Sequence, residues 1–115
     1  MVKIADIVNE LGAKVICGEH KIEQEIRMGF ASDLMSDVLT LDTENMLLIT
    51  GLNNLQTIRT SEMSDISYIL FVRDKKASEE MKELACENDI MLLECSHSMF
   101  RACASLYQMG LEPVY

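Results

Sequence analysis

The chain has 115 residues and a mass of 13.0 kDa, which predicts a single domain over residues 1–115 with one compact core. Its net charge of −9 disfavours binding to nucleic acid or to an anionic membrane surface, because both require a basic surface on the protein. Charged residues interrupt the start of the sequence and no apolar run is long enough to span a membrane, so we expect a cytoplasmic protein without a signal peptide.

The first part of the chain predicts one helix followed by two strands. Apolar residues recur on one face of the segment Lys3–Leu11, as in a short amphipathic helix. The segments Ala13–Cys17 and Glu25–Ala31 are typical of strands, and the second alternates apolar with polar or small residues. After them, Ser32 or Asp33 is expected to cap a short helical segment.

The rest of the chain predicts a β-α-β-α-β-α succession. Short apolar runs at Met46–Ile49, Ile66–Val72 and Ile90–Leu93 are typical of strands that are buried on both faces. Apolar residues at roughly helical spacing predict a helix after each of them. Leu55, Ile58 and Met63 recur at this spacing in the first helix, and Met81, Leu84, Ala85 and Asn88 form one face of the second. In the third, Met99, Cys103, Leu106 and Met109 are expected to face inward. We therefore expect an α/β fold, a mostly parallel central sheet with helices on both faces and the early strands at the sheet edge.

The loops that follow the three predicted parallel strands form the candidate site. Ligands of open parallel sheets bind beyond the carboxyl ends of the strands, where helix N-termini present free N–H groups. These loops offer hydroxyls, amides, cations and an imidazole, which would suit an anionic or phosphate-bearing small molecule; the alternative is that they are helix caps and solvated turns. The candidate ligand-binding residues are Thr50, Gly51, Asn53, Asn54, Arg73, Lys75, Ser96, His97 and Ser98.

Two long segments resemble a known family. The runs LLITGLNNLQTIRTSEM and ILFVRDKKASEEMKELACENDIMLLECSHSMFRACASLYQMGL, together with the opening of the chain, resemble a stand-alone member of the DRTGG-domain family, which is similar to the N-terminal domain of HPr kinase/phosphorylase. The resemblance implies a small α/β domain, often dimeric, with a regulatory or architectural role. The family's Gly-Asp-Arg would fall near Gly51–Asn54 and its Thr-Gly-Gly near Arg73–Lys75, and this chain carries neither motif.

These observations favour a non-catalytic regulatory module without a cofactor or metal. It is expected to form a homodimer and to bind a protein partner or a small anionic or nucleotide ligand, and Tyr107 and Tyr115 are candidates for an interface. One alternative is a switch domain of the anti-sigma-antagonist type, phosphorylated on Ser96 or Ser98.

A second alternative is a thiol enzyme that uses Cys95 and His97. The four cysteines lack a CxxC spacing, so buried, reduced thiols are expected instead. A metal site built from Cys95, His97 and Cys103 is disfavoured, because Cys103 should face the sheet from within a helix.

Overall fold

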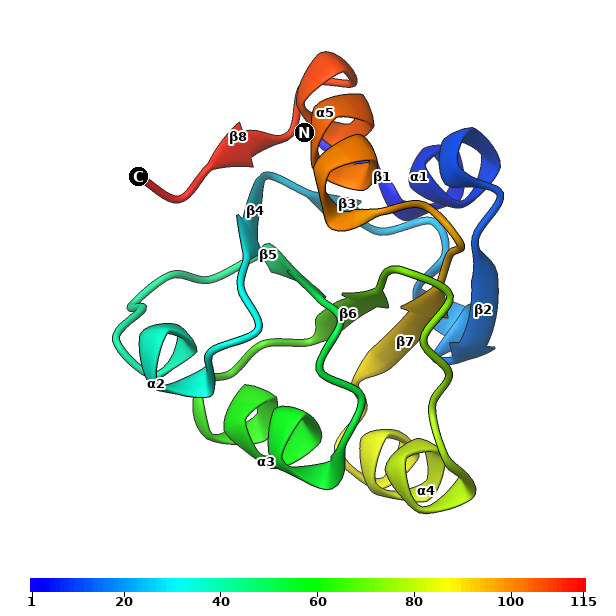
Figure 1. Ribbon diagram of the computed structural model, residues 1–115. Coiled ribbons are helices and arrows are strands. Elements are labelled where there is room, and N and C mark those ends of the chain that lie inside the picture. The colour runs from blue at the N-terminus through cyan, green and yellow to red at the C-terminus, as the bar shows by residue number, and fades with distance from the viewer.

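A six-stranded mixed sheet forms the centre of the computed structural model, which describes residues 1–115 (Figure 1). The strands are β1 (Val2–Lys3), β2 (Lys14–Cys17), β3 (Glu25–Ile26), β4 (Met28–Ala31), β5 (Met46–Thr50), β6 (Tyr68–Phe71), β7 (Met91–Glu94) and β8 (Glu112–Pro113). The helices are α1 (Ile4–Leu11), α2 (Met35–Val38), α3 (Leu55–Met63), α4 (Glu79–Glu87) and α5 (Met99–Gln108), with a short 3₁₀ helix at Glu19–Lys21. No helix is both long and apolar enough to cross a membrane.

The strand order in the sheet is β2-β7-β6-β5-β4-β8. The strands from β7 to β8 in this order are parallel, and only β2 runs antiparallel, beside β7. The expected α/β fold with a mostly parallel sheet is therefore confirmed, and β2 is the early strand at the edge. The segment predicted at Glu25–Ala31 is instead divided into two strands. Of these, β3 pairs with β1 in a separate two-stranded sheet, and β4 lies inside the main sheet.

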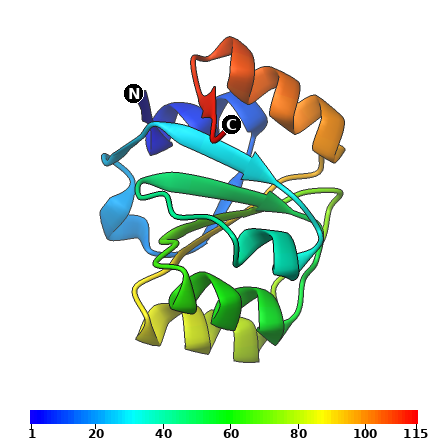
Figure 2. The same cartoon turned by 90° about the vertical axis from the view of Figure 1, so that its left-hand side faces the viewer.

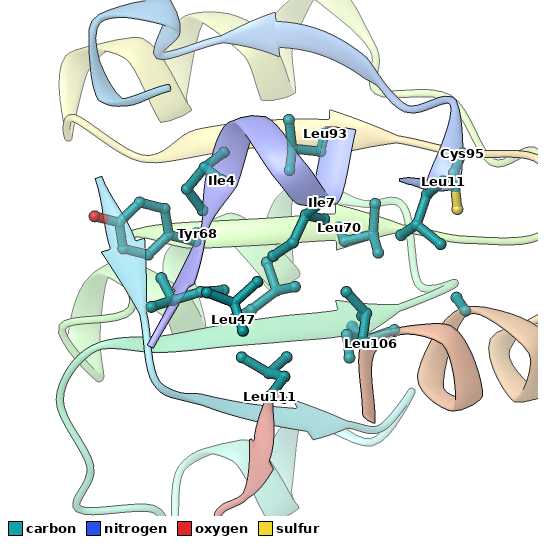
Figure 3. Close-up of a cluster of buried hydrophobic side chains, with 14 of the residues drawn as sticks. Ile4, Ile7, Leu11, Leu47, Tyr68, Leu70, Leu93, Cys95, Leu106 and Leu111 are labelled. Atoms are coloured by element: carbon teal, nitrogen blue, oxygen red, sulfur yellow. The ribbon is translucent and has the colours of Figure 1, made fainter. Parts of the chain in front are cut away.

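Helices cover both faces of the sheet, as the sequence predicts. Helices α1 and α5 lie on one face and α3 and α4 on the other, and α2 packs beside α3 (Figures 1 and 2). The predicted single core is two clusters, one on each side, because neighbouring residues of a buried strand point to opposite faces. Leu47 and Leu70 belong to the cluster under α1 and α5 (Figure 3), whereas Leu48 and Ile69 belong to the cluster under α3 and α4.

The C-terminal strand β8 was not predicted from the sequence. Its two residues pair with Met28 and Gly29 at the outer side of β4. The chain reaches this position through Leu111, which is buried in the first cluster and lies against Gly29. A Cβ atom on Gly29 would be 2.8 Å from Leu111 Cδ2, so any larger residue here would require the Leu111 side chain to shift.

Candidate functional site

The carboxyl ends of β4, β5, β6 and β7 lie along one edge of the sheet, because these four strands are parallel. In Figure 2 the arrowheads of β4 and β5 point to the same side. Three of the loops at this edge are those predicted from the sequence. The fourth loop follows β4 and brings Asp33 to the same edge. The sequence predicted Ser32 or Asp33 as a helix cap here, but α2 begins after Leu34 without a side-chain cap.

Asp33 joins three of these loops. Its Oδ1 accepts hydrogen bonds from the Gly51 N–H at 2.7 Å and the Thr50 hydroxyl at 3.0 Å, and its Oδ2 lies 3.2 Å from Arg73 Nη2. Burial opposes the charged form, but the two hydrogen bonds and the Arg73 guanidinium outweigh it and hold the pKa of Asp33 below its usual value. Asp33 is therefore a carboxylate at neutral pH and accepts the bonds from Gly51, Thr50 and Arg73.

The guanidinium of Arg73 lies against the backbone of Gly51. A Cβ atom at position 51 would be 2.1 Å from Arg73 Nη2, so any side chain larger than that of glycine would displace the guanidinium. The Arg73 side chain is nevertheless 47% exposed. The result is a cation that is held in place and still open to solvent, and a planar guanidinium of this kind suits carboxylate or phosphate groups.

The backbone after β6 adopts an unusual conformation that fixes the position of Arg73. Arg73 and Asp74 have φ angles of 60° and 59°, in the left-handed region that is costly for residues other than glycine. Two hydrogen bonds hold this turn, from the Arg73 N–H to the His97 carbonyl at 2.7 Å and from the Asp74 N–H to the Cys95 carbonyl at 3.1 Å. The loops after β6 and β7 are thus tied together.

Besides Thr50 and Arg73, three more of the predicted site residues use their side chains within the fold. Asn54 caps α3 by accepting a hydrogen bond from the Thr57 N–H at 3.1 Å, and Ser98 caps α5 by accepting one from the Arg101 N–H at 3.1 Å. Asn53 donates to the Lys76 carbonyl at 2.8 Å. The alternative that these polar residues serve as caps and turn supports therefore describes Asn54, Ser98 and Asn53.

Other predicted residues remain without side-chain hydrogen bonds. Lys75 and Ser96 are exposed and His97 is half-buried. None of the nine candidate residues lines any of the four hollows in the protein surface. The candidate site is therefore an open edge that carries Arg73, Lys75 and the N-termini of α3 and α5.

Comparison with known proteins identifies the family. The sequence matches the DRTGG domain over residues 6–109, most of its length. The chain belongs to the DRTGG domain family. Its structure is similar to the crystal structure of the CBS and DRTGG domains of the regulatory region of Clostridium perfringens pyrophosphatase complexed with the activator diadenosine tetraphosphate, with a TM-score of 0.77 and 17% sequence identity.

That similarity covers 94% of this chain and 47% of the other, so this chain spans about half the length of its structural neighbour. A search of curated proteins found no match.

This DRTGG domain carries an acid and an arginine at the candidate edge from two separate loops. The resemblance places the family's Gly-Asp-Arg near Gly51–Asn54, where Leu52, Asn53 and Asn54 follow the glycine. Asp33 and Arg73 bring a carboxylate and a guanidinium against Gly51 from the ends of the two flanking strands. Sequence reasoning missed Asp33, and the only signal for it was its position directly after a strand.

Cys95, the cysteine at this edge, is buried among packed side chains. Cys95 is 4% exposed, and burial raises the pKa of its thiol, which disfavours the thiolate that a nucleophile requires. No group of three or more His, Cys, Asp or Glu side chains is arranged to hold a metal ion. The expectation that all cysteines are buried is wrong for Cys86, which lies exposed on α4, and Cys103 is only half-buried.

Proposed function

We propose that this DRTGG domain is a non-catalytic regulatory module that binds a small anionic ligand at the carboxyl edge of its sheet. The observation that supports this function best is the Arg73 guanidinium, which is held against Gly51 and remains half-exposed. An anion that contacts the solvent side of Arg73 would gain a charge-assisted bond without moving the side chain away from Asp33. The neighbouring Lys75 adds a second exposed cation.

A phosphate-bearing ligand fits the rest of this edge. Helix α3 begins directly after Asn54, and the N-terminus of a helix favours negative charge. Asn53 and Asn54 are exposed directly before this helix, whereas Thr50 and Gly51 are buried behind them. The loop Ser96–Ser98 lies beside Arg73 through the bond to the His97 carbonyl. The structural neighbour was crystallised with diadenosine tetraphosphate, so nucleotide polyphosphates are the first ligands to test.

The test is a thermal-shift and calorimetric titration of the native chain with diadenosine tetraphosphate, ATP, pyrophosphate and inorganic phosphate. A ligand that binds only the folded state stabilises it by about 2.7 kcal/mol at a concentration 100 times its Kd, which is a rise of several degrees in Tm. Arg73→Gln should weaken binding at least about tenfold, the loss expected for one charge-assisted hydrogen bond.

Arg27→Gln is the matched control. Arg27 is also an exposed arginine with an acidic partner, Glu112 at 3.5 Å, but it precedes β4 and so lies at the opposite end of the strands. This variant should bind like the unaltered chain. No shift with any of the anions, or equal binding by the Arg73 and Arg27 variants, would contradict the proposed site.

The domain is further proposed to act as a homodimer. Helix α5 exposes Phe100 by 85% and Tyr107 by 70%, and their spacing of seven residues places them on one side of the helix. Two exposed aromatic side chains on one side of a helix are typical of an interface between proteins. Tyr115, 91% exposed, lies instead near Phe30, with 6.1 Å between the ring centroids, and Phe30 packs against the cluster under α3 and α4.

Light scattering at micromolar concentration measures the oligomeric state directly. The unaltered chain should have the mass of a dimer, and Phe100→Glu should have that of a monomer. Met63→Glu is the control, because Met63 is equally apolar and 74% exposed but lies on α3, on the opposite face of the sheet. A monomeric unaltered chain would exclude the dimer.

A dimer that binds none of the anions would leave a protein partner as the ligand.

The four cysteines are all free, which is typical of a protein that works in the reducing cytoplasm, and we propose that the domain functions there.

A further inference from the structure

Cys17 lies on the edge strand β2, where this strand packs against α4, the helix that carries Cys86. Cys17 Sγ donates a hydrogen bond to the Ile90 carbonyl at 3.2 Å. The Ile90 N–H in turn donates to the Ala85 carbonyl at 2.9 Å, within the last turn of α4. The Cys17 sulfur therefore lies beside the turn of helix that carries Cys86.

Cys17 also belongs to the buried cluster that contains Met81 and Ala85 of α4, so its side chain faces this helix. The pairing of β2 with β7 shifts between Val15 and Cys17, so a bulge turns this part of the edge strand. Ile16, within the bulge, and Lys82 on α4 line the same hollow of about 430 Å³. Because Lys82 and Cys86 are four residues apart, they share the side of α4 that faces β2.

We propose that Cys17 and Cys86 form a thiol pair that peroxide or an oxidised low-molecular-weight thiol converts reversibly to a disulfide. One sulfur of the pair is exposed and the other is buried, so a reagent in solution reaches Cys86 first. Burial and the nearby Cys86 thiol raise the pKa of Cys17 to about 11, so Cys17 is protonated at neutral pH and Cys86 is the thiol that reacts first.

One molecule of hydrogen peroxide oxidises the two thiols in two steps. The Cys86 sulfur attacks one peroxide oxygen, the O–O bond breaks, and Cys86 becomes a sulfenic acid as a water molecule leaves. The Cys17 sulfur then attacks the Cys86 sulfur, the S–O bond breaks, and the hydroxyl leaves with the Cys17 proton as a second water molecule. Two electrons pass from the thiols to the peroxide, and an added dithiol reverses the change.

The disulfide between Cys17 and Cys86 would join β2, the one antiparallel strand of the main sheet, to α4. Cys17 and Cys86 are far apart in the chain, and cross-links that close long loops restrict the unfolded state most strongly. Helix α4 follows directly from the loop whose Lys76 carbonyl accepts the bond from Asn53. Oxidation would thus fix the helix that begins beside the candidate edge.

The experiment treats the native, reduced chain with hydrogen peroxide or oxidised glutathione and maps the cysteine peptides by mass spectrometry without reduction. The expected product is a single intramolecular link between the Cys17 and Cys86 peptides, removed by dithiothreitol. The Tm of the linked chain should rise by at least about 5 °C. Cys103→Ser should form the same link, and Cys86→Ser and Cys86→Ala should form none and show no rise in Tm.

Several results would overturn the proposal. These are a native chain that forms no internal link, one that joins Cys86 to Cys95, Cys103 or a second chain, and one in which Cys86 retains glutathione without exchange to Cys17. A Cys17–Cys86 link that forms only in urea, or that fails to raise Tm, would equally show that the folded structure does not bring the two thiols together. Circular dichroism of the Cys86 variants establishes that they are folded.

Discussion

The Arg73 guanidinium lies 3.2 Å from the Asp33 carboxylate, although the two residues are 40 positions apart in the chain. Asp33 follows β4 and Arg73 follows β6, and β5 runs between these two strands. The ion pair therefore spans the end of β5, where the chain carries Gly51. The glycine leaves room for the guanidinium and its N–H binds the carboxylate, so one position serves both partners.

Replacing Asp33 by Ala should destabilise the domain by about 1 to 2 kcal/mol at neutral pH, since a half-exposed carboxylate loses its bonds from Gly51, Thr50 and Arg73. The pKa of Asp33 is lower in the folded state than in the unfolded chain. Its contribution is therefore complete above the unfolded value of about 4 and is lost as the pH falls through the lower folded value.

Urea unfolding at neutral pH and at several acidic pH values measures this contribution. Asp37→Ala is the control, because Asp37 is exposed in the same segment and its carboxylate makes no hydrogen bond. The two variants should converge as Asp33 becomes protonated. A loss for Asp33→Ala that is the same at every pH would contradict the assigned role of the charge.

Gly51→Ala should cost less than about 1 kcal/mol, because the new Cβ displaces only the end of the half-exposed Arg73 side chain and so separates it from Asp33. Arg73→Ala should cost a similar amount, since it removes the same exposed ion pair. In the double variant the overlap is gone, so the loss should be smaller than the sum of the two single losses. Strict additivity in this double-mutant cycle would mean that Arg73 does not occupy the space over Gly51.

The strands at the centre of the fold could be predicted because their residues are apolar on both faces. The runs that became β5, β6 and β7 contain residues such as Leu47 and Leu48 in succession, a pattern that suits a strand covered on both sides. The caps at Asn54 and Ser98 follow from local chemistry of the same kind. Each of these features is set by a few neighbouring residues.

The role of Asp33 could not be predicted in this way. It depends on β4 lying next to β5, and nothing in the segment Met28–Ala31 specifies which strand it joins. Strand β8 could not be predicted either, because Glu112 and Pro113 show neither alternation nor β propensity, and their place beside β4 follows from the buried Leu111 that precedes them. The predicted site therefore contained the loops after β5, β6 and β7, and it lacked Asp33, which follows β4.

Lys21 offers a test of a buried charge away from this edge. Its side chain is 7% exposed, and its Nζ lies 3.4 Å from Asp89 Oδ2 and 5.3 Å from the centre of the Tyr68 ring. Lys21→Ala should cost about 2 kcal/mol or more, because it removes the packed stem as well as the bonds of the ammonium group.

Lys21→Met keeps most of the stem and should fall between Lys21→Ala and the unaltered chain in denaturant unfolding. Lys75→Ala, at an exposed lysine without a hydrogen-bonded partner, should change stability by less than about 0.5 kcal/mol. If Lys21→Ala were as mild as Lys75→Ala, the packing of Lys21 under Tyr68 would contribute nothing.

Ser96 and Ser98 form a matched pair that separates a helix cap from a free hydroxyl. Ser98 Oγ accepts a hydrogen bond from the Arg101 N–H at 3.1 Å, whereas the exposed Ser96 makes no side-chain hydrogen bond. Ser98→Ala should therefore destabilise the domain by about 1 kcal/mol and Ser96→Ala by almost nothing. Ser98→Asp should restore most of the loss, because a carboxylate accepts the same bond and interacts favourably with the positive end of α5. Urea unfolding measures all three variants, and equal losses at the two serines would show that the start of α5 does not depend on this cap.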